Sequence, residues 1–260
     1  MAHEFIPGSF TAPLSVFAKF IGAINALTCE CRMHIAPGEV RVFSVDPSNV
    51  GLIDVKMAVA DLKGRAVLGI DVAALGCPIR RLAEIFSADD HAEVVVSWCH
   101  GKDSVRPYLD IEISGMKYRF ETLDETAVLK DPKGFNPDLP ARFTCDGAQF
   151  ARAVSLCSVF SERCRIEVSR DGAVTMAGKG DRTQCRIPLS AGGNIIAAAL
   201  YSLDYMKDLS RALDGYPLMV EMGTDHPIRI SARMTPALTV SYALAPRIES
   251  DDTVAETGWL

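Results

Sequence analysis

The sequence predicts an α+β protein made of two copies of one unit, each an antiparallel sheet with two helices laid on one face. The first observation is an internal repeat, because residues 17–32 recur at 150–165 with a constant offset of 133 positions. The repeat places a basic residue at the same point of each copy, Lys19 and Arg152. The second observation is that four segments show helical spacing of apolar residues, whereas the segments between them are short and rich in β-forming residues.

Four amphipathic helices are expected, two in each copy of the repeat. A second repeat offset, of 131 positions, relates Arg80 in the second helix to Arg211 in the fourth. The apolar faces consist of Phe17, Phe20, Ile21, Ile24 and Leu27 in the first helix, Val72, Leu75, Ile79, Leu82 and Phe86 in the second, Phe150, Val154 and Cys157 in the third, and Leu203, Met206, Leu209 and Leu213 in the fourth.

The second helix contains an interruption, Gly76 and Pro78. Because proline inside a helix removes a hydrogen bond and kinks the chain, this helix is expected to begin or bend near Pro78. The positions of Arg80 and Arg81 depend on where it begins.

Strands are expected where short runs of β-branched and aromatic residues stand between turn signals. They are residues 32–35, 40–45, 93–98, 108–114, 117–121, 165–168, 174–177, 217–222, 228–232 and 239–244. The stretch 123–141 is rich in turn residues and is interpreted as the connection between the two copies. The chain therefore divides into an N-terminal domain, an interdomain connecting loop, a C-terminal domain and an acidic tail, at residues 1–123, 124–141, 142–249 and 250–260.

The composition is that of a globular protein, with 48% hydrophobic and 23% charged residues in 260. A net charge of −6 argues against a protein that coats itself in nucleic acid. The longest apolar run, 195–200, is too short to span a bilayer, and no secretory signal is recognisable, so a soluble intracellular protein is expected. The eight cysteines include no CxxC pair, and Cys29, Cys31 and His34 lack a fourth metal ligand. We expect buried reduced thiols and no metal.

A basic residue recurs on the exposed face of every expected helix. These residues are Lys19, Arg80 with Arg81, Arg152, and Lys207 with Arg211. One interpretation is that they only solvate the helix faces. The other is a sparse cationic surface that meets the phosphates of duplex DNA without reading bases, since no exposed aromatic residues are interleaved for stacking on single strands. The pattern alone does not decide between the two.

Several motifs extend the argument over nearly the whole chain. They are SVDPSNV at 44–50, GIDVAAL at 69–75, FAR at 150–152, GTDHP at 223–227 and LAPRIE at 244–249. On these motifs the chain resembles the DNA sliding clamps called proliferating cell nuclear antigen, in their archaeal form, from about residue 14 to residue 249. The LAPRIE motif at the end of a twofold repeat is the most specific of the set.

The resemblance implies the DNA-clamp fold, assembled from three copies of the chain into a closed ring that encircles duplex DNA. The helices would line the hole, and polymerase, clamp loader, ligase and nuclease would bind through short motif peptides. It implies no catalysis and no cofactor. Cys77 and Ser155 stand where relatives carry cations, so a less positive hole is expected. Neighbouring copies would pair through Lys117, Tyr118, Arg119 and Phe120 on one side and Thr183, Cys185 and Ile187 on the other.

The resemblance also implies a groove for partner peptides, which insert a short helical turn with apolar anchors. For Val50 and Leu52, periodicity does not separate a groove from an ordinary core. The groove residues are Val45, Val50 and Leu52, Val128 and Leu129 of the connecting loop, and Pro227, Ala245 and Pro246.

Three other functions were weighed against this one. An enzymatic function has little support. Gly178–Asp181 is too short for a phosphate-binding loop, and Cys99 next to His100 is an isolated pair of neighbours that does not by itself indicate a thiol nucleophile. A subunit of a heteromeric clamp or scaffold ring that mainly binds proteins would have the same fold. A monomeric β-rich binding module would not self-associate. The expected location is the cytoplasm, in association with the nucleoid, or the nucleus for a eukaryotic source.

Overall fold

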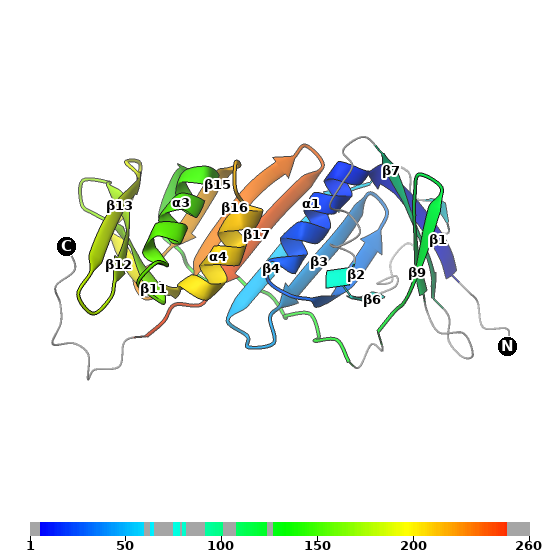
Figure 1. Cartoon of the computed structure of the whole chain (residues 1–260), viewed down its shortest axis with the longest axis horizontal. Coiled ribbons are helices and arrows are strands. Elements are labelled where there is room, and N and C mark those ends of the chain that lie inside the picture. The colour runs from blue at the N-terminus through cyan, green and yellow to red at the C-terminus, as the bar shows by residue number, and fades with distance from the viewer. Residues whose placement is uncertain are drawn as a thin grey trace. The chain divides into compact units, whose positions relative to one another are not determined.

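A computed structural model describes residues 6–59, 63–64, 75–78, 80–81, 92–100, 108–123 and 127–248 (Figure 1). The chain forms two compact units. Unit 1 comprises Met1–Pro47, Ile53–Pro132 and Met234–Val240, and unit 2 comprises Ser48–Leu52, Lys133–Arg233 and Ser241–Leu260. The change from one unit to the other at residues 132 and 133 falls within the connecting loop predicted at 124–141.

Unit 1 contains two groups of antiparallel strands and one described helix, α1 (Leu14–Asn25). One sheet has the order β5-β1-β7-β8-β9, from Lys63–Gly64, Ile6–Pro13, Glu93–His100, Tyr108–Ile113 and Met116–Glu121. The other group runs β4-β3-β2-β6, from Gly51–Ala58, Glu39–Val45, Glu30–Ala36 and Leu75–Pro78. The first two residues of β4 belong to unit 2.

The helix α1 forms as the periodicity predicts. Phe17, Phe20, Ile21 and Ile24 are fully buried, and the Phe17 ring lies 6.1 Å from both the Phe10 and the Phe20 ring. These aromatic contacts fix the helix against the core of unit 1. Ala23 is also only 1% exposed, so the apolar stripe is wider than the predicted face.

The second predicted helix is wrong over residues 75–78. These residues form β6, which pairs antiparallel with β2 and places Gly76 opposite Arg32 and Pro78 opposite Glu30. Glycine and proline disfavour a helix, and proline is tolerated on an edge strand, the position that β6 occupies. Arg80 and Arg81 are helical and exposed. The other residues of this predicted helix lie outside the described part of the chain.

Unit 2 contains the helices α3 (Gly147–Cys157) and α4 (Leu203–Ala212). One sheet has the order β13-β12-β11-β14, from Gln184–Ser190, Val174–Lys179, Arg163–Val168 and Ala197–Ser202. The other strands run β10-β15-β16-β17, from Ala141–Asp146, Pro217–Met222, Ile228–Thr235 and Leu238–Leu244. The α+β prediction with antiparallel sheets is confirmed.

The two helices of unit 2 lie side by side and cover strands of the same sheet (Figure 1). The Asp146 carboxylate caps α3 by accepting a hydrogen bond from the Gln149 amide at 3.0 Å. Gly147 is required at the start of α3, because a Cβ there would lie 2.2 Å from the Leu213 carbonyl oxygen. The backbones of α3 and the end of α4 can therefore approach closely.

The repeat predicted at residues 17–32 and 150–165 reappears as equivalent elements. Both copies run helix, strand, tight turn and strand, as α1-β2-β3 and α3-β11-β12. The turn glycines of the two copies, Gly38 and Gly172, adopt φ values of 83° and 82°, a conformation that other residues rarely adopt. The longest described helix has 12 residues, and none in the described ranges is long and apolar enough to cross a membrane.

Candidate functional site

The predicted cationic residues lie on the helices, away from the buried faces. Lys19 on α1 and Arg152 on α3 are exposed, as are Arg80 and Arg81. Neither Lys19 nor Arg152 forms an ion pair with another described residue. Because their charges are not neutralised by described carboxylates, these side chains can meet an anionic ligand.

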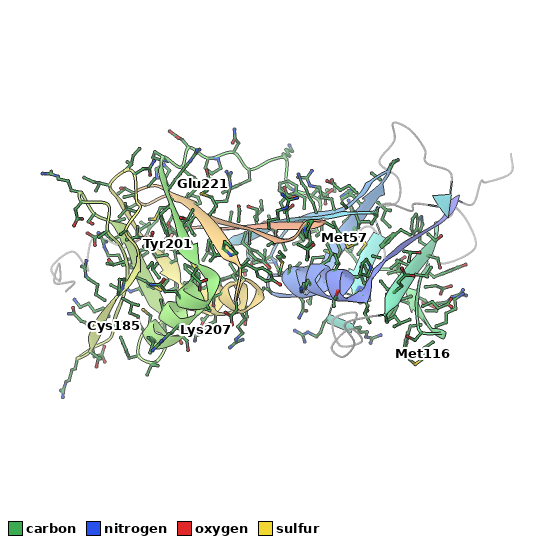
Figure 2. The ribbon with its side chains drawn as sticks, turned by 90° about the horizontal axis from the view of Figure 1, so that it is seen from above. Met57, Met116, Cys185, Tyr201, Lys207 and Glu221 are labelled. Atoms are coloured by element: carbon green, nitrogen blue, oxygen red, sulfur yellow. The ribbon has the colours of Figure 1, made fainter. Side chains whose placement is uncertain are left out.

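Both cations on α4 are paired with acids one turn earlier, which the sequence analysis missed. Arg211 Nη1 lies 2.9 Å from Asp208 Oδ1, and Lys207 Nζ lies 3.8 Å from Asp204 Oδ1. The i,i+3 spacing of these pairs was readable in the sequence. The exposed side of α4 therefore carries two positive and two negative charges. Figure 2 shows Lys207 on the opposite side of unit 2 from Glu221.

The helix α3 also exposes apolar side chains. Leu156 is 45% exposed, and Val159, just beyond the end of the helix, is 77% exposed. Ser155 is exposed as well. The side of α3 that carries Arg152 is therefore sparse in charge.

The predicted interface residues of unit 1 lie on β9, the last strand of its sheet. Tyr118 is 36% exposed and Met116 is 55% exposed, although their partners in the register, Ile111 and Ile113, are buried. Phe120, which pairs with Leu109, is half-buried. The apolar face of the sheet thus continues to an edge that no described element covers, which is typical of an association surface.

Two of the predicted interface residues have a partner within β8. Arg119 donates hydrogen bonds of 2.7 and 2.8 Å to the two Asp110 carboxylate oxygens, and Lys117 Nζ lies 3.5 Å from the same carboxylate. The Asp110 side chain is 4% exposed. The Arg119 hydrogen bonds lower the pKa of Asp110, against the opposing effect of burial. The guanidinium also lies 3.9 Å from the centre of the Tyr108 ring, so Arg119 stabilises unit 1 itself.

The predicted interface residues of unit 2 lie at β13, the first strand of its sheet. Thr183 is exposed, and Cys185 and Ile187 are half-buried. Cys185 Sγ lies 3.5 Å from Cys157 Sγ, so its side chain faces α3. Burial raises the pKa of the Cys157 thiol, and no group of three metal-ligating side chains occurs in the described residues.

The predicted groove residues differ in exposure. In unit 1, Val45 is half-buried, Val128 is 5% exposed and Leu129 is 45% exposed. Val128 therefore packs in the core of unit 1, and Leu129 is the open one of the two.

The groove residues assigned to unit 2 all remain partly open. Val50, Leu52, Pro227, Ala245 and Pro246 are half-buried. The Ala245 amide donates a hydrogen bond of 2.8 Å to the Val50 carbonyl, which brings these two distant segments together. Part of the predicted set is thus adjacent in space.

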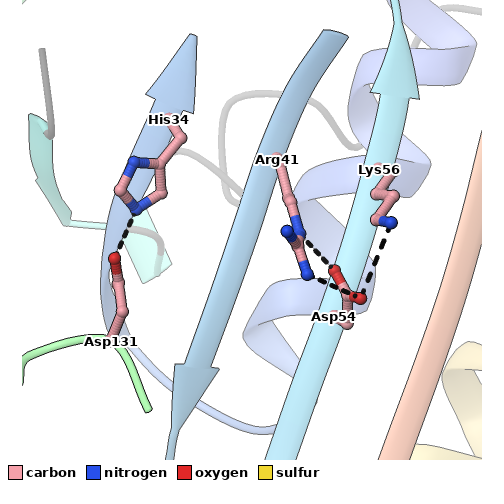
Figure 3. Close-up of polar contacts among 5 residues, drawn as sticks. All are labelled: His34, Arg41, Asp54, Lys56 and Asp131. Carbon is pink, nitrogen blue, oxygen red and sulfur yellow. Dashed lines mark hydrogen bonds and ion pairs between the residues drawn. The ribbon is translucent and has the colours of Figure 1, made fainter. Parts of the chain in front are cut away.

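A polar cluster on the outer face of β2, β3 and β4 was not predicted (Figure 3). His34 Nε2 lies 2.6 Å from Asp131 Oδ2, and Arg41 donates to both oxygens of Asp54 at 2.7 and 3.0 Å. Lys56 Nζ lies 3.9 Å from the same Asp54 carboxylate. In the sequence, His34 stood out only as a neighbour of Cys29 and Cys31 in an incomplete set of metal ligands.

A polar pocket of about 530 Å³ lies in unit 2 between residues 136–140 and β15 and β16. Its charged side chains are largely paired, since Glu221 accepts from Arg229 at 3.2 Å and lies 3.1 Å from Arg142. Arg229 also contacts the Phe135 ring at 5.4 Å. The contacts of Arg229 with Phe135 therefore hold the second half of the connecting loop against unit 2.

The chain is similar to several archaeal proteins. No model of a known protein family matches it. A DNA polymerase sliding clamp of Methanosarcina acetivorans is 30% identical over 243 residues, which cover 89% of this chain and 94% of the relative. A DNA polymerase sliding clamp of Methanocorpusculum labreanum is 29% identical over 250 residues, which cover 93% and 98%.

Solved structures share the fold. The structure of A. fulgidus PCNA with the C-terminal region of FEN-1 bound has a TM-score of 0.80 at 22% identity, covering 94% of this chain and 100% of that one. PCNA from Thermococcus kodakaraensis has a TM-score of 0.75 at 18% identity, covering 92% and 100%.

Proposed function

This chain belongs to the family of DNA polymerase sliding clamps, and we propose that three copies form a closed ring that encircles duplex DNA and tethers DNA-processing enzymes. The ring acts without catalysis and without a cofactor. The observation that carries the proposal is the doubled α+β fold in which β9 of unit 1 and β13 of unit 2 each stand at the end of a sheet, paired with one strand among the described residues.

These two edges are different surfaces of the same chain. When two different surfaces pair, the contact is head-to-tail, and such a contact closes into a ring or continues as a filament. Pairing β9 of one copy with β13 of the next would satisfy both backbone edges and cover Met116 and Tyr118. The proposed interface also includes Lys117, Arg119, Phe120, Thr183, Cys185 and Ile187.

The proposed DNA-facing surface is the exposed side of the helices. Its cations attract phosphates without regard to base sequence. Because the ring retains DNA by enclosing it, a sparse surface is sufficient and tight phosphate contacts would hinder sliding. The residues assigned to this surface are Lys19, Arg80, Arg81, Arg152, Lys207 and Arg211.

Partners bind, in this proposal, through short peptides in the predicted groove. The A. fulgidus relative has the C-terminal region of FEN-1 bound, which supports nuclease binding here. Polymerase, clamp loader and ligase would use the same groove, and the protein would act where the DNA is, in the cytoplasm or nucleus. The groove comprises Val45, Val50, Leu52, Val128, Leu129, Pro227, Ala245 and Pro246.

The test is retention on circular DNA. The purified chain is loaded by a clamp loader onto nicked circular DNA and separated from free protein at moderate salt. We expect retention on the circle and release after a restriction enzyme linearises it, since a ring slides off free ends. Equal retention on circular and linear DNA would overturn encirclement and indicate ordinary binding.

A further inference from the structure

The described part of the connecting loop, called the connecting segment below, has no regular backbone structure to hold it in place. Residues 127–140 are all described, and none lies in a helix or strand. Val128 is nevertheless buried, whereas its neighbour Leu129 is 45% exposed. Since a strand ladder does not orient this segment, side-chain contacts must decide which residue faces outward.

One such contact joins the segment to β2. The bond between His34 Nε2 and Asp131 Oδ2 is 2.6 Å long and links residues 97 positions apart (Figure 3). An ionised carboxylate can only accept, so the ring nitrogen donates. The other oxygen, Asp131 Oδ1, is buried and has no hydrogen-bond partner among the described residues. One carboxylate oxygen is therefore turned inward and the other binds His34, although the Asp131 side chain as a whole is 31% exposed.

The neighbouring cations Arg41 and Lys56 are paired with another carboxylate, Asp54. Arg41 stands opposite His34 in the β2–β3 register, but its guanidinium is bound to both oxygens of Asp54. The pKa of Arg41 is raised first by that hydrogen bond, and Glu39 and Asp131 add to the effect. Lys56 Nζ lies 3.9 Å from the same Asp54 carboxylate. Among the described side chains, His34 is thus the one that bonds directly to Asp131.

We propose that His34 is a positioning residue for partner binding, because its bond to Asp131 holds the connecting segment against β2 with Leu129 outward. The inference rests on the proposed function, in which Leu129 forms part of the partner groove. A segment that is already ordered loses less conformational entropy when a peptide binds, so affinity rises. The burial of Val128 and the bond from Asp131 to His34 of β2 fix the segment on both sides of Leu129.

The experiment measures binding of a fluorescent peptide from the C-terminal region of A. fulgidus FEN-1 to the full chain. The variants are His34→Ala, Asp131→Ala, the double variant and His34→Gln, in which the amide nitrogen can replace the ring donor. Asp138→Ala is the matched control, since Asp138 is an exposed acid of the same segment. Hydrogen exchange of residues 127–133 is followed in parallel.

We expect each alanine variant to weaken peptide binding by about threefold to tenfold, and the double variant to be no weaker than either single variant. Exchange at 127–133 should accelerate in the same variants, whereas His34→Gln and Asp138→Ala should resemble the unmodified chain. Independent, multiplying effects of the two alanine substitutions, or unchanged binding in His34→Ala, would overturn the role of His34 and leave the clamp function intact. Failure of the unmodified chain to bind the peptide would instead contradict the proposed groove.

Discussion

On α4, the guanidinium of Arg211 lies 2.9 Å from the carboxylate of Asp208, one helical turn earlier. Lys207 stands in the same relation to Asp204. Such exposed pairs contribute little to stability, but each one offsets a positive charge on the surface assigned to DNA. The acids of α4 therefore keep this surface weakly attractive.

The first prediction is that Asp204→Asn with Asp208→Asn strengthens DNA binding, because two cations lose their neutralising partners. The slope of log affinity against log salt concentration should become steeper by about 1 to 2, since up to two more phosphates can be contacted. Fluorescence anisotropy with a short duplex at several salt concentrations measures the slope. Asp214→Asn, at an exposed acid beyond the helix, should leave it unchanged.

The second prediction concerns the cations themselves. Replacing Arg80, Arg152 and Arg211 by alanine should shorten the products of a polymerase on primed circular DNA, because the phosphates lose their attractive contacts. All three side chains are exposed, so the free energy of unfolding should change by no more than about 0.5 kcal/mol per site. If the well-folded triple variant gave products of unchanged length, another surface would face the DNA.

The third prediction tests the β9 edge. Tyr118→Arg should raise the dissociation constant of the assembly by at least about a hundredfold, since pairing would bury an uncompensated charge. Val95→Arg is the matched control: Val95 is 37% exposed, close to the 36% of Tyr118, but its register partners place it on the other face of the same sheet. Sedimentation velocity over a concentration series compares the two. Equal weakening by both substitutions would argue against a specific contact at Tyr118.

The fourth prediction is a pH dependence at Asp110. Because Arg119 lowers its pKa in the folded chain, the carboxylate contributes stability that is present above the ordinary aspartate pKa, about 3.9, and is lost as the pH falls through the lowered value. Asp110→Asn should therefore cost about 1–3 kcal/mol at pH 7 and progressively less below pH 4. Urea unfolding of the variant and the unmodified chain, at pH 7 and again below pH 4, measures this difference in the free energy of unfolding. Glu112→Gln, at an exposed site on the same strand, should show no comparable loss.

The sequence was most informative where spacing is local. The duplicated stretch predicted α1 and α3 with their buried faces, and in both copies the helix leads into a strand, a tight turn and a second strand. The wrong prediction of a helix at residues 75–78 also had a local cause. The apolar residues there have helical spacing, but Gly76 and Pro78 disfavour a helix, and these four residues form β6.

Contacts between distant positions were not predictable in the same way. The bond between His34 and Asp131 spans 97 positions, and nothing in the spacing of either residue marks its partner. The acids beside Lys207 and Arg211 could have been found from their i,i+3 spacing. They were missed because cations alone were compared between the two copies.

The most direct test of the central claim is the mass of the purified chain in solution, measured by sedimentation equilibrium at micromolar concentration. Three chains of 28.1 kDa predict a single species of about 84 kDa. A species of one or two chains that persists as the concentration rises would contradict the ring.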